Sequence, residues 1–330
     1  MLKELEIAGM VCPNNVMLAP LAGYTNFPFR EMCRRLGAGL TFTEMVSCKG
    51  LMYGNEETKK LLYHGEDIPG ARTFKAGNPE SGTPGAVAPK AAQIFGCDPA
   101  IMRAACEGED LAPFDLIDIN MGCPMPKVVR NGEGSALMEN LPLAEKVISE
   151  CAKSGKRISV KFRTGVTEDK KITVEFAKMC EGAGACMITV HGRTRDKVYA
   201  GAPDYAEIAA AKNAVKIPVI ANGGVWSDGD FEKMLTRTGA DGVMIARAAL
   251  YRPQVFADIA GVEAPPMKEL FSRQLAETLE LYGERFACVF MRKMAAFYLK
   301  GRQGAAEYKR RLFSAETTNE VAALAEEIFN

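Results

Sequence analysis

The segment LIDINMGCP (116–124) joins a short apolar run to a polar turn that contains glycine and proline. Seven further apolar runs have the same form, and helical periodicity follows each of them: VMLAP (16–20), LTFTEM (40–45), AAQIF (91–95), ISVKF (158–162), MITVH (187–191), PVIAN (218–222) and GVMIA (242–246). Runs that are apolar on both faces are typical of buried parallel strands. The intervening segments, such as PLAEKVISECAKSG (142–155) and DYAEIAAAKNAV (204–215), space their apolar residues as helices do. Eight β-α units predict an α/β fold, a closed (β/α)8 barrel of the TIM type.

A doubly wound open sheet is the alternative fold. Such a sheet usually has fewer strands, and it carries a G-x-G-x-x-G turn after its first strand when it binds a dinucleotide. That motif is absent from this sequence. The candidate functional residues instead fall at or just past the C-terminal ends of the proposed strands, where (β/α)8 barrels place their active sites: Pro20, Glu44, Gln93, Asn120, Lys161, His191 and Asn222.

Beyond residue 252 the strand pattern stops and only helical periodicity continues. It runs through four segments: KELFSRQLAETLELYG (268–283), RFACVFMRKMAAFYLK (285–300), GAAEYKRRLFSA (304–315) and ETTNEVAALAEEIF (316–329). The stretch GVEAPP (261–266) precedes them as a stiff linker. We therefore divide the chain into a catalytic barrel domain, residues 1–252, and a small all-helical domain, residues 253–330. Within the barrel, residues 69–90 are rich in Gly and Pro and predict a long surface loop of unassigned role.

The composition of the 330 residues, 48% hydrophobic and 25% charged, excludes a disordered or fibrous chain. Ten cysteines are scattered without a CxxC pair and there are only two histidines, so we expect neither a disulfide framework nor a metal site. The N-terminus lacks the apolar core of a signal peptide, and no uncharged stretch of about 18 residues occurs. We therefore expect a cytoplasmic protein with no membrane partner.

The charges balance over the whole chain but not locally. Lys and Arg number 41, as do Asp and Glu, so no global field attracts nucleic acid. Residues 285–311, however, hold eight basic side chains against Glu307 alone, a net charge of +7. At about 100° per residue, four of the eight fall on one face of the predicted helix, which predicts a local patch for a nucleic-acid backbone: Arg285, Arg292, Lys293 and Lys300.

Cys123 differs from the other nine cysteines because it stands in a Gly-Cys-Pro turn at the end of a strand. An ordinary thiol has a pKa of about 8.5, so it is mostly protonated near neutrality and can act as an acid. A nucleophilic role would need an activating group close by. A small residue that only fills a turn is the other interpretation.

The next two strands end in cationic side chains. Lys161 alternates out of an apolar strand, where a lysine commonly extends to the rim of a barrel, but beside an electron-rich cofactor its ammonium would stabilise negative charge. His191, Arg193 and Arg195 follow one strand later. A lone histidine is often structural, and its place beside Lys161 favours function.

The last two strands end in Asn222-Gly223-Gly224 and Ala246-Arg247. Loops after strands seven and eight commonly bind phosphate in this fold, because backbone N–H groups and a helix N-terminus favour an anion there. Together with Gln93, Lys161 and Cys123 they suggest flavin mononucleotide (FMN) across the barrel mouth.

The sequence resembles the tRNA-dihydrouridine synthases over nearly its whole length. The motifs that carry the resemblance occur in order: APLAGYTNFPFR (19–30), GAGLTFTEMVS (37–47), QIFG (93–96), DINMGCP (118–124) with KVVRNGEGSALM (127–138), VKFRTG (160–165), HGRTR (191–195) with Tyr199 and Gly201, and IPVIANGGV (217–225). The resemblance implies a flavoenzyme that uses FMN, reduced by NADPH, to reduce the C5–C6 double bond of particular uridines in tRNA.

The resemblance also implies a role for each matching residue. Cys123 would protonate C5 while the flavin delivers hydride to C6, and Asn120 would orient the flipped-out base. Arg193, Arg195 and the basic face of residues 285–300 would contact tRNA. The remaining residues would bind FMN: Pro20, Leu21 and Ala22 beneath the ring, Gln93 and Lys161 at its polar edge, His191 beside it, and Asn222, Gly223, Gly224, Ala246 and Arg247 around the phosphate.

Three positions depart from the family pattern, which more often has Gly, Gly and Trp where this chain has Ala246, Ala248 and Gln254. If position 246 needs a positive φ, alanine there would cost about 1 kcal/mol and weaken flavin retention.

Two other functions remain open at this point: a barrel flavoprotein that reduces a free pyrimidine or another small enone, and an RNA-binding module whose catalytic centre has lapsed. We expect a monomer that binds tRNA and not DNA. The modified uridine and the preference for NADPH over NADH are not encoded in these motifs.

Overall fold

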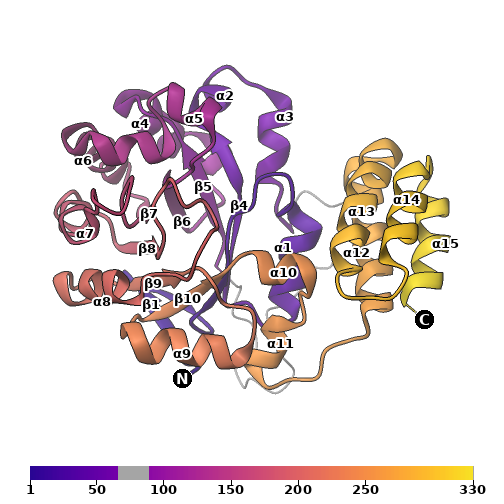
Figure 1. Cartoon of the computed structure of the whole chain (residues 1–330). Coiled ribbons are helices and arrows are strands. Elements are labelled where there is room, and N and C mark those ends of the chain that lie inside the picture. The colour runs from indigo at the N-terminus through magenta and orange to yellow at the C-terminus, as the bar shows by residue number, and fades with distance from the viewer. Residues whose placement is uncertain (66–88, 330) are drawn as a thin grey trace.

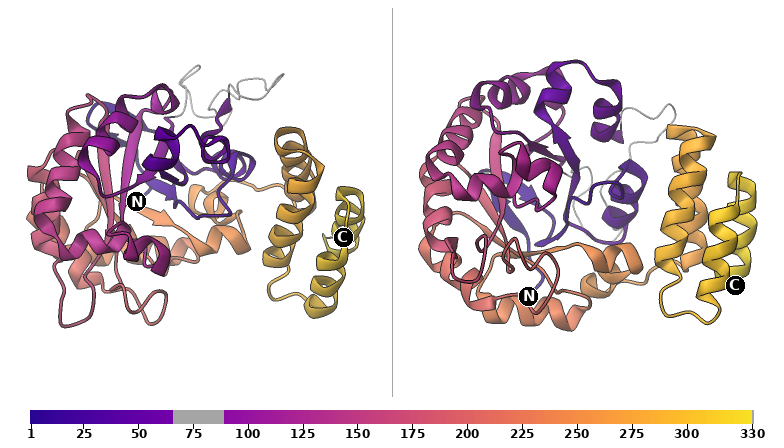
Figure 2. Two further views of the ribbon diagram at one scale, coloured as in Figure 1. Left: turned by 90° about the horizontal axis from the view of Figure 1, so that it is seen from above. Right: turned by 45° about the horizontal axis from the view of Figure 1, so that its top comes forward.

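The computed structural model describes residues 1–65 and 89–329. Eight parallel strands close into a barrel that is ringed by helices (Figures 1 and 2). In barrel order from β3 they are β3 (Val16–Leu18), β4 (Leu40–Ser47), β5 (Ala91–Phe95), β6 (Leu116–Met121), β7 (Arg157–Arg163), β8 (Met187–His191), β9 (Val219–Asn222) and β10 (Gly242–Ile245). Each coincides with one of the eight predicted runs, so the barrel is confirmed and the open sheet is wrong. The predicted loop at 69–90 lies, except for its last two residues, outside the described residues.

The strands are apolar on both faces because each face meets a different core. On β6, Ile117, Ile119 and Met121 pack outward against the surrounding helices, whereas Leu116 belongs to a separate apolar cluster at the lower end of the barrel interior. Side chains alternate along a strand, so Asp118 shares the inward face with Leu116. The barrel interior is therefore apolar at its base and polar at its top.

A short hairpin that the sequence analysis missed closes the base. It consists of β1 (Leu5–Ile7) and β2 (Met10–Cys12). Its inward residues pack into the interior cluster with Phe42. Strands of three residues show too little periodicity to be recognised, although the Ala8-Gly9 turn between them, with φ of 47° and 80°, is a hairpin signal.

The helices around the barrel follow the strands they connect. The longer ones are α1 (Phe27–Arg35), α4 (Pro99–Glu107), α6 (Leu141–Ala152), α7 (Thr173–Gly182), α8 (Tyr205–Ala214) and α9 (Asp228–Thr238). Short helices lie at the rims: α2 (Cys48–Met52), α3 (Glu56–Lys59), α5 (Pro126–Arg130), α10 (Arg247–Tyr251) and α11 (Val255–Ala260). All ten cysteines carry free thiols.

Four helices form a separate group beside the barrel (Figure 1). They are α12 (Met267–Tyr282), α13 (Glu284–Tyr298), α14 (Ala305–Ser314) and α15 (Thr318–Phe329). Each matches one of the four segments with helical periodicity. The expected boundary at residue 252 precedes α11, which contacts α9 and α10, and the group itself begins at α12 after the Pro-rich linker. Within the described parts of the chain, no helix is both long and apolar enough to cross a membrane.

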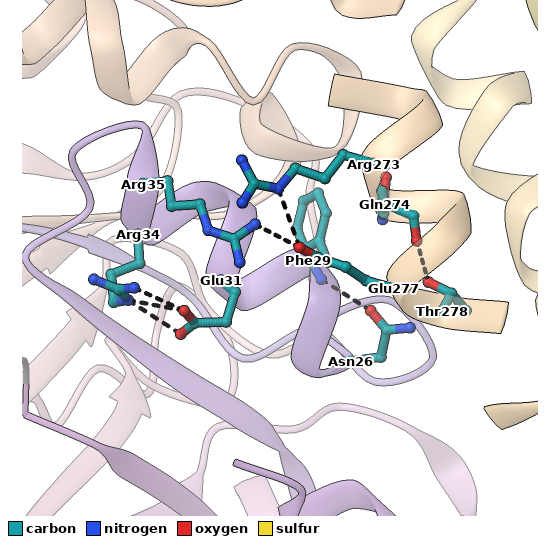
Figure 3. A network of polar contacts seen from close by, with 9 residues as sticks. All are labelled: Asn26, Phe29, Glu31, Arg34, Arg35, Arg273, Gln274, Glu277 and Thr278. Carbon is teal, nitrogen blue, oxygen red and sulfur yellow. Dashed lines mark hydrogen bonds and ion pairs between the residues drawn. The ribbon is translucent and has the colours of Figure 1, made fainter. Parts of the chain in front are cut away.

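The helical group is fixed to the barrel mainly through α1 and α10, which contact α12 and α13 respectively. Arg35 of α1 donates to Glu277 of α12 at 2.8 Å, and Arg273 of α12 reaches the same carboxylate at 3.2 Å (Figure 3). Asn26 caps α1 by accepting from the Phe29 amide at 3.2 Å. These contacts place α13 close to the C-terminal ends of the barrel strands.

Candidate active site

A cavity of about 290 Å³ lies at the C-terminal ends of the strands. Such a volume is near the lower end of the range for small-molecule sites. Every residue predicted to bind FMN lines it, together with the predicted acid and the predicted base-orienting amide: Pro20, Leu21, Ala22, Gln93, Asn120, Cys123, Lys161, His191, Asn222, Gly223, Gly224, Ala246 and Arg247. Met45, Met244 and Val225 add apolar surface, so the cavity combines apolar walls with a few convergent polar groups.

The loop after β6 presents Cys123 to the cavity. The Cys123 amide donates to Oδ1 of Asn120 at 2.9 Å, and its carbonyl accepts from the amide and hydroxyl of Ser135 at 3.1 and 2.8 Å. Burial raises the pKa of the Cys123 thiol, and the Met125 amide, Arg163 and Lys161 only partly oppose this. The thiol is therefore protonated at neutral pH, as an acid must be.

Below this loop lies a series of hydrogen-bonded side chains, Asn120, Gln93 and Asp118, which we call the ladder. Asn120 accepts from the amides of Gly122 and Cys123 and donates through Nδ2 to Oε1 of Gln93 at 2.8 Å. Gln93 donates through Nε2 to Asp118 at 2.7 Å, and Ser159 donates to the same carboxylate at 2.7 Å. The register of the barrel brings these residues together, because Gln93 pairs with Asp118 and Asp118 with Ser159. Both functional groups of Asn120 are thus engaged, and its role in holding the thiol loop was not foreseen.

Cations gather next to the thiol loop, on β7 and in the loop after β8. Burial and the neighbouring Arg163 lower the pKa of Lys161 to about 8, against the opposing effect of Asp118. Burial also lowers the pKa of Arg163 to about 10. The pKa of His191 is lowered well below its usual value by burial and by four cations, Lys161 and Arg163 foremost, so this imidazole is neutral. Arg193 lies 3.3 Å from its Nε2 and can only donate, which places the ring proton on Nδ1.

The ends of β9 and β10 form the glycine-lined part of the cavity. Asn222 donates to the Met244 carbonyl at 2.7 Å and holds the two strand ends together. Gly223 has a φ of 117°, and a Cβ there would lie 2.9 Å from the His191 ring. Glycine is therefore required at that position. Ala246, in contrast, has a φ of −114°, so the positive φ on which the expected cost of alanine depends is not present.

Arg193 and Arg195, predicted to contact tRNA, have partners within the protein. Arg193 is only 6% exposed and donates to the carbonyls of Ala200 and Gly201. It supports the loop after β8. Arg195 pairs with Glu139 at 2.5 Å. Neither residue lines the cavity.

The predicted basic face of α13 does not form one surface. Lys300 lies beyond the end of the helix at Tyr298. Arg292 donates to the carbonyls of Phe313 and Ala315, next to the start of α15. Lys293 donates to the Gly23 carbonyl in the loop after β3. Arg285 is exposed. Simple helical periodicity cannot reveal such differences, because they depend on what packs against each side.

Sequence analysis missed several residues at the site. Arg163 donates to the Gly122 carbonyl at 2.8 Å and to the carbonyls of Thr194 and Val198, and so it joins the thiol loop to the loop after β8. Asp118 lies under the cavity. Both could have been found, because they stand two residues from Lys161 and Asn120 and therefore point inward with them.

Aromatic rings and cations lie at the mouth of the cavity. The Arg247 guanidinium lies 4.4 Å from the Tyr199 ring centroid and 5.5 Å from that of Trp226. On the side of the helical group, the Lys300 ammonium lies 3.9 Å from the Tyr251 ring and 5.1 Å from that of Trp226. Trp226 is 43% exposed. The mouth thus offers flat surfaces and positive charge to whatever approaches the cavity.

Known proteins are similar to this chain over nearly its whole length. The family model described as dihydrouridine synthase matches residues 17–330. Proteins named tRNA-dihydrouridine synthase B are similar: that of Pseudomonas aeruginosa is 33% identical, with 98% of this chain and 96% of the relative covered, and that of Xanthomonas axonopodis is 35% identical, with 96% and 92% covered.

Among solved structures, the fold of morphinone reductase is similar, with a TM-score of 0.55 at 14% identity over 81% of this chain and 92% of the other. A variant of NCR from Zymomonas mobilis has a TM-score of 0.54 at 16% identity, with 85% of this chain and 97% of the other covered. At these identities the two structures support the fold alone.

Proposed function

Because this chain belongs to the dihydrouridine synthase family, we propose that it reduces the C5–C6 double bond of specific uridines in tRNA, with FMN bound in the cavity and NADPH as reductant. The observation that carries the proposal is the Cys123 thiol, which lines the same cavity as Lys161, His191 and the glycines after β9. A small cavity that combines a thiol with several cations suits a planar, anionic cofactor and an enone-like substrate.

The residues present fit FMN. Its ring would lie against Pro20, Leu21 and Ala22, with Gln93 and Lys161 at the polar edge, and its phosphate would meet Gly223, Gly224 and Arg247 beside Asn222 and Ala246. Four cations, Lys161, Arg163, Arg193 and Arg247, lie near His191, and such a concentration of positive charge favours an anion. When bound, the flavin supplies the hydride for C6 after it has been reduced by NADPH.

Cys123 would give its proton to C5 of the uracil ring as the C5–C6 bond becomes saturated. The S–H bond breaks, a C–H bond forms at C5, and the thiolate is left beside the Met125 amide, Arg163 and Lys161, which all favour the charged form. Water then returns a proton to the thiolate. General acid catalysis of this kind typically contributes about 10²- to 10⁴-fold to the rate.

The target base must leave its stack to reach a cavity of this size, because an enzyme acting on a ring carbon cannot work on a stacked base. We assign the neighbouring nucleotides to the mouth, where Tyr199 and Trp226 offer stacking surfaces and Lys300 and Arg247 offer charge. Arg285 would contact the tRNA backbone. The partners of Arg193, Arg195, Arg292 and Lys293 within the protein give these four residues supporting roles in the proposal.

In this account residues 1–252 catalyse and residues 253–330 bind tRNA, in a cytoplasmic monomer that does not act on DNA. The test is to incubate the FMN-reconstituted protein with NADPH and either an unmodified tRNA transcript or free uridine, and then to map dihydrouridine by mass spectrometry. We expect flavin absorbance and dihydrouridine at discrete tRNA positions, with free uridine unchanged. Equal reduction of free uridine would favour a small-enone reductase, and binding of tRNA without any reduction would favour an RNA-binding module.

A further inference from the structure

Asp118 is a fully buried carboxylate that the proposed reaction does not use. It is 0% exposed and does not line the cavity. Burial raises its pKa to about 6, although hydrogen bonds from Gln93 and Ser159 and the charge of Lys161 favour the ionised form. Holding a carboxylate there is costly, since its two hydrogen-bond donors are neutral. A neutral side chain would cost less if only packing mattered.

The ladder above Asp118 has a fixed direction that can be derived from the backbone. The amides of Gly122 and Cys123 can only donate, so the atom of Asn120 that faces them, at 3.1 and 2.9 Å, must be its oxygen. Its nitrogen therefore faces Gln93, whose facing atom must be oxygen, at 2.8 Å. The Gln93 nitrogen is then left to face position 118 at 2.7 Å, and it needs an acceptor there.

An ionised carboxylate provides this acceptor, and the direction of its hydrogen bond with Gln93 cannot be reversed. It has no hydrogen to donate, so it accepts from Gln93 in every arrangement and prevents the Gln93 amide from turning over. If Gln93 turned, two oxygens would face each other at Asp118 and two N–H groups would face each other at Asn120. The acceptor at position 118 thereby selects the orientation of the Gln93 and Asn120 side-chain amides. The Asn120 amide in turn holds the loop that carries the Cys123 thiol.

We propose that Asp118 is a positioning residue for Cys123: by accepting a hydrogen bond from Gln93, it fixes the orientation of the Gln93 and Asn120 amides and so holds the Cys123 loop in place. The inference rests on the proposed function for its catalytic meaning. The geometry of the loop itself is independent of the substrate.

Three variants separate the acceptor from the charge. Asp118→Ala removes the acceptor. Asp118→Asn keeps one, because the new amide can turn its oxygen to Gln93 and donate to the Ser159 hydroxyl, which can accept. Ser159→Ala removes the other hydrogen bond of Asp118 and leaves the ladder intact. If Asp118→Ala is poorly folded, Asp118→Val fills the space in the strand without providing an acceptor.

The readout is the rate at which iodoacetamide alkylates Cys123 in the holoenzyme as a function of pH, followed by mass spectrometry of the peptide that contains it. Cys180, on the inward face of α7, is fully buried, so its protection in the same sample reports that the barrel is folded. Without the acceptor, the buried N–H group of Gln93 has no partner and the Cys123 loop is released. We therefore expect Cys123 in Asp118→Ala to be alkylated about tenfold faster. The pH at the midpoint of its alkylation curve should move closer to the pKa of an ordinary thiol. Asp118→Asn and Ser159→Ala are expected to match the wild type.

Unchanged alkylation in a folded Asp118→Ala or Asp118→Val protein would overturn the proposal. The proposal would also be overturned if Asp118→Asn changed the alkylation rate of Cys123 as much as Asp118→Ala does. That result would assign the effect to the charge of Asp118. Reduction of tRNA is measured separately on the same proteins, and we expect it to slow in Asp118→Ala while FMN stays bound. Failure of the wild type to reduce tRNA, with the alkylation pattern as expected, would reject the proposed function and leave the positioning role in place.

Discussion

At the scale of single residues, the site could be predicted well where the residue type itself defines the chemistry. Cys123, Lys161 and the glycines after β9 all line the cavity, as their positions at strand ends suggested. The partners within the protein could not be predicted, because a hydrogen bond such as that of Asn120 with Gln93 depends on the register between two different strands. Arg193 shows the same limit, since only the folded loop reveals that its guanidinium is buried.

The protonation state of Cys123 leads to a pH dependence with a definite sign. Its pKa is raised by burial, and the reaction needs the protonated form. The rate of uridine reduction by pre-reduced enzyme should therefore not rise with pH, and it should fall as the pH rises through this pKa, which lies above the ordinary value of about 8.5. Loss of the Lys161 charge, with its pKa of about 8, acts in the same direction. Stopped-flow measurement of flavin reoxidation by tRNA checks this. A rate that increases with pH would indicate a thiolate nucleophile instead.

Ala246 gives a second prediction at this scale. Its φ is negative, so this position does not need glycine for a left-handed backbone. Glycine there would add freedom to the unfolded chain, at a cost of about 0.5–1 kcal/mol of stability. We expect Ala246→Gly to lower the melting temperature slightly and to leave the FMN dissociation constant within about twofold, measured by fluorescence titration. Markedly tighter FMN binding would show that alanine does restrict the site.

At the scale of elements, the strands and long helices follow directly from periodicity, whereas the contact between α13 and the barrel does not. The Lys293 ammonium donates to the Gly23 carbonyl and lies 4.3 Å from the Tyr24 ring, while the Gly23 amide donates to Glu44. The loop after β3, which lines the cavity through Pro20, Leu21 and Ala22, is thus held from both the barrel and α13. Lys293, which was predicted to bind tRNA, therefore contacts the loop that we propose for the cofactor.

Substitution of Lys293 should therefore affect the cofactor. We expect Lys293→Ala to weaken FMN binding about three- to tenfold, because a charge-assisted hydrogen bond at a half-exposed site is worth roughly 1 kcal/mol. Fluorescence titration with FMN measures the effect. Arg285→Ala, on the exposed start of the same helix, is the matched control and should leave FMN binding unchanged. Equal FMN affinities in the two variants would show that the contact between Lys293 and the Gly23 carbonyl does not contribute to FMN binding.

At the scale of the whole molecule, a net charge of zero coexists with a local excess of +7 in residues 285–311. Part of that excess is engaged internally: Arg310 pairs with Glu307 and Arg311 with Glu327. The sequence predicted the excess but not these pairings, since Glu327 lies on another helix. In the proposed function, Lys300 and Arg285 meet the tRNA backbone, one at the mouth of the cavity and one at the exposed start of α13.

Charge reversal at Arg285 tests this arrangement. We expect Arg285→Glu to weaken tRNA binding by about three- to tenfold and to reduce the slope of log K against log salt by about one unit, because one phosphate contact is lost. Filter binding over a salt series gives both quantities. An unchanged slope would place the RNA elsewhere on the molecule.

The central claim is that Cys123 supplies the proton for reduction of a tRNA uridine beside a bound flavin. It is tested most directly by a single turnover in which pre-reduced, FMN-loaded protein reacts with an unmodified tRNA transcript, for the wild type and for Cys123→Ala. We predict that the wild type forms dihydrouridine in step with flavin reoxidation, and that Cys123→Ala binds FMN and tRNA normally but reacts at least about 10²-fold more slowly. Equal rates in the two proteins, or flavin reoxidation without dihydrouridine in the wild type, would contradict the account.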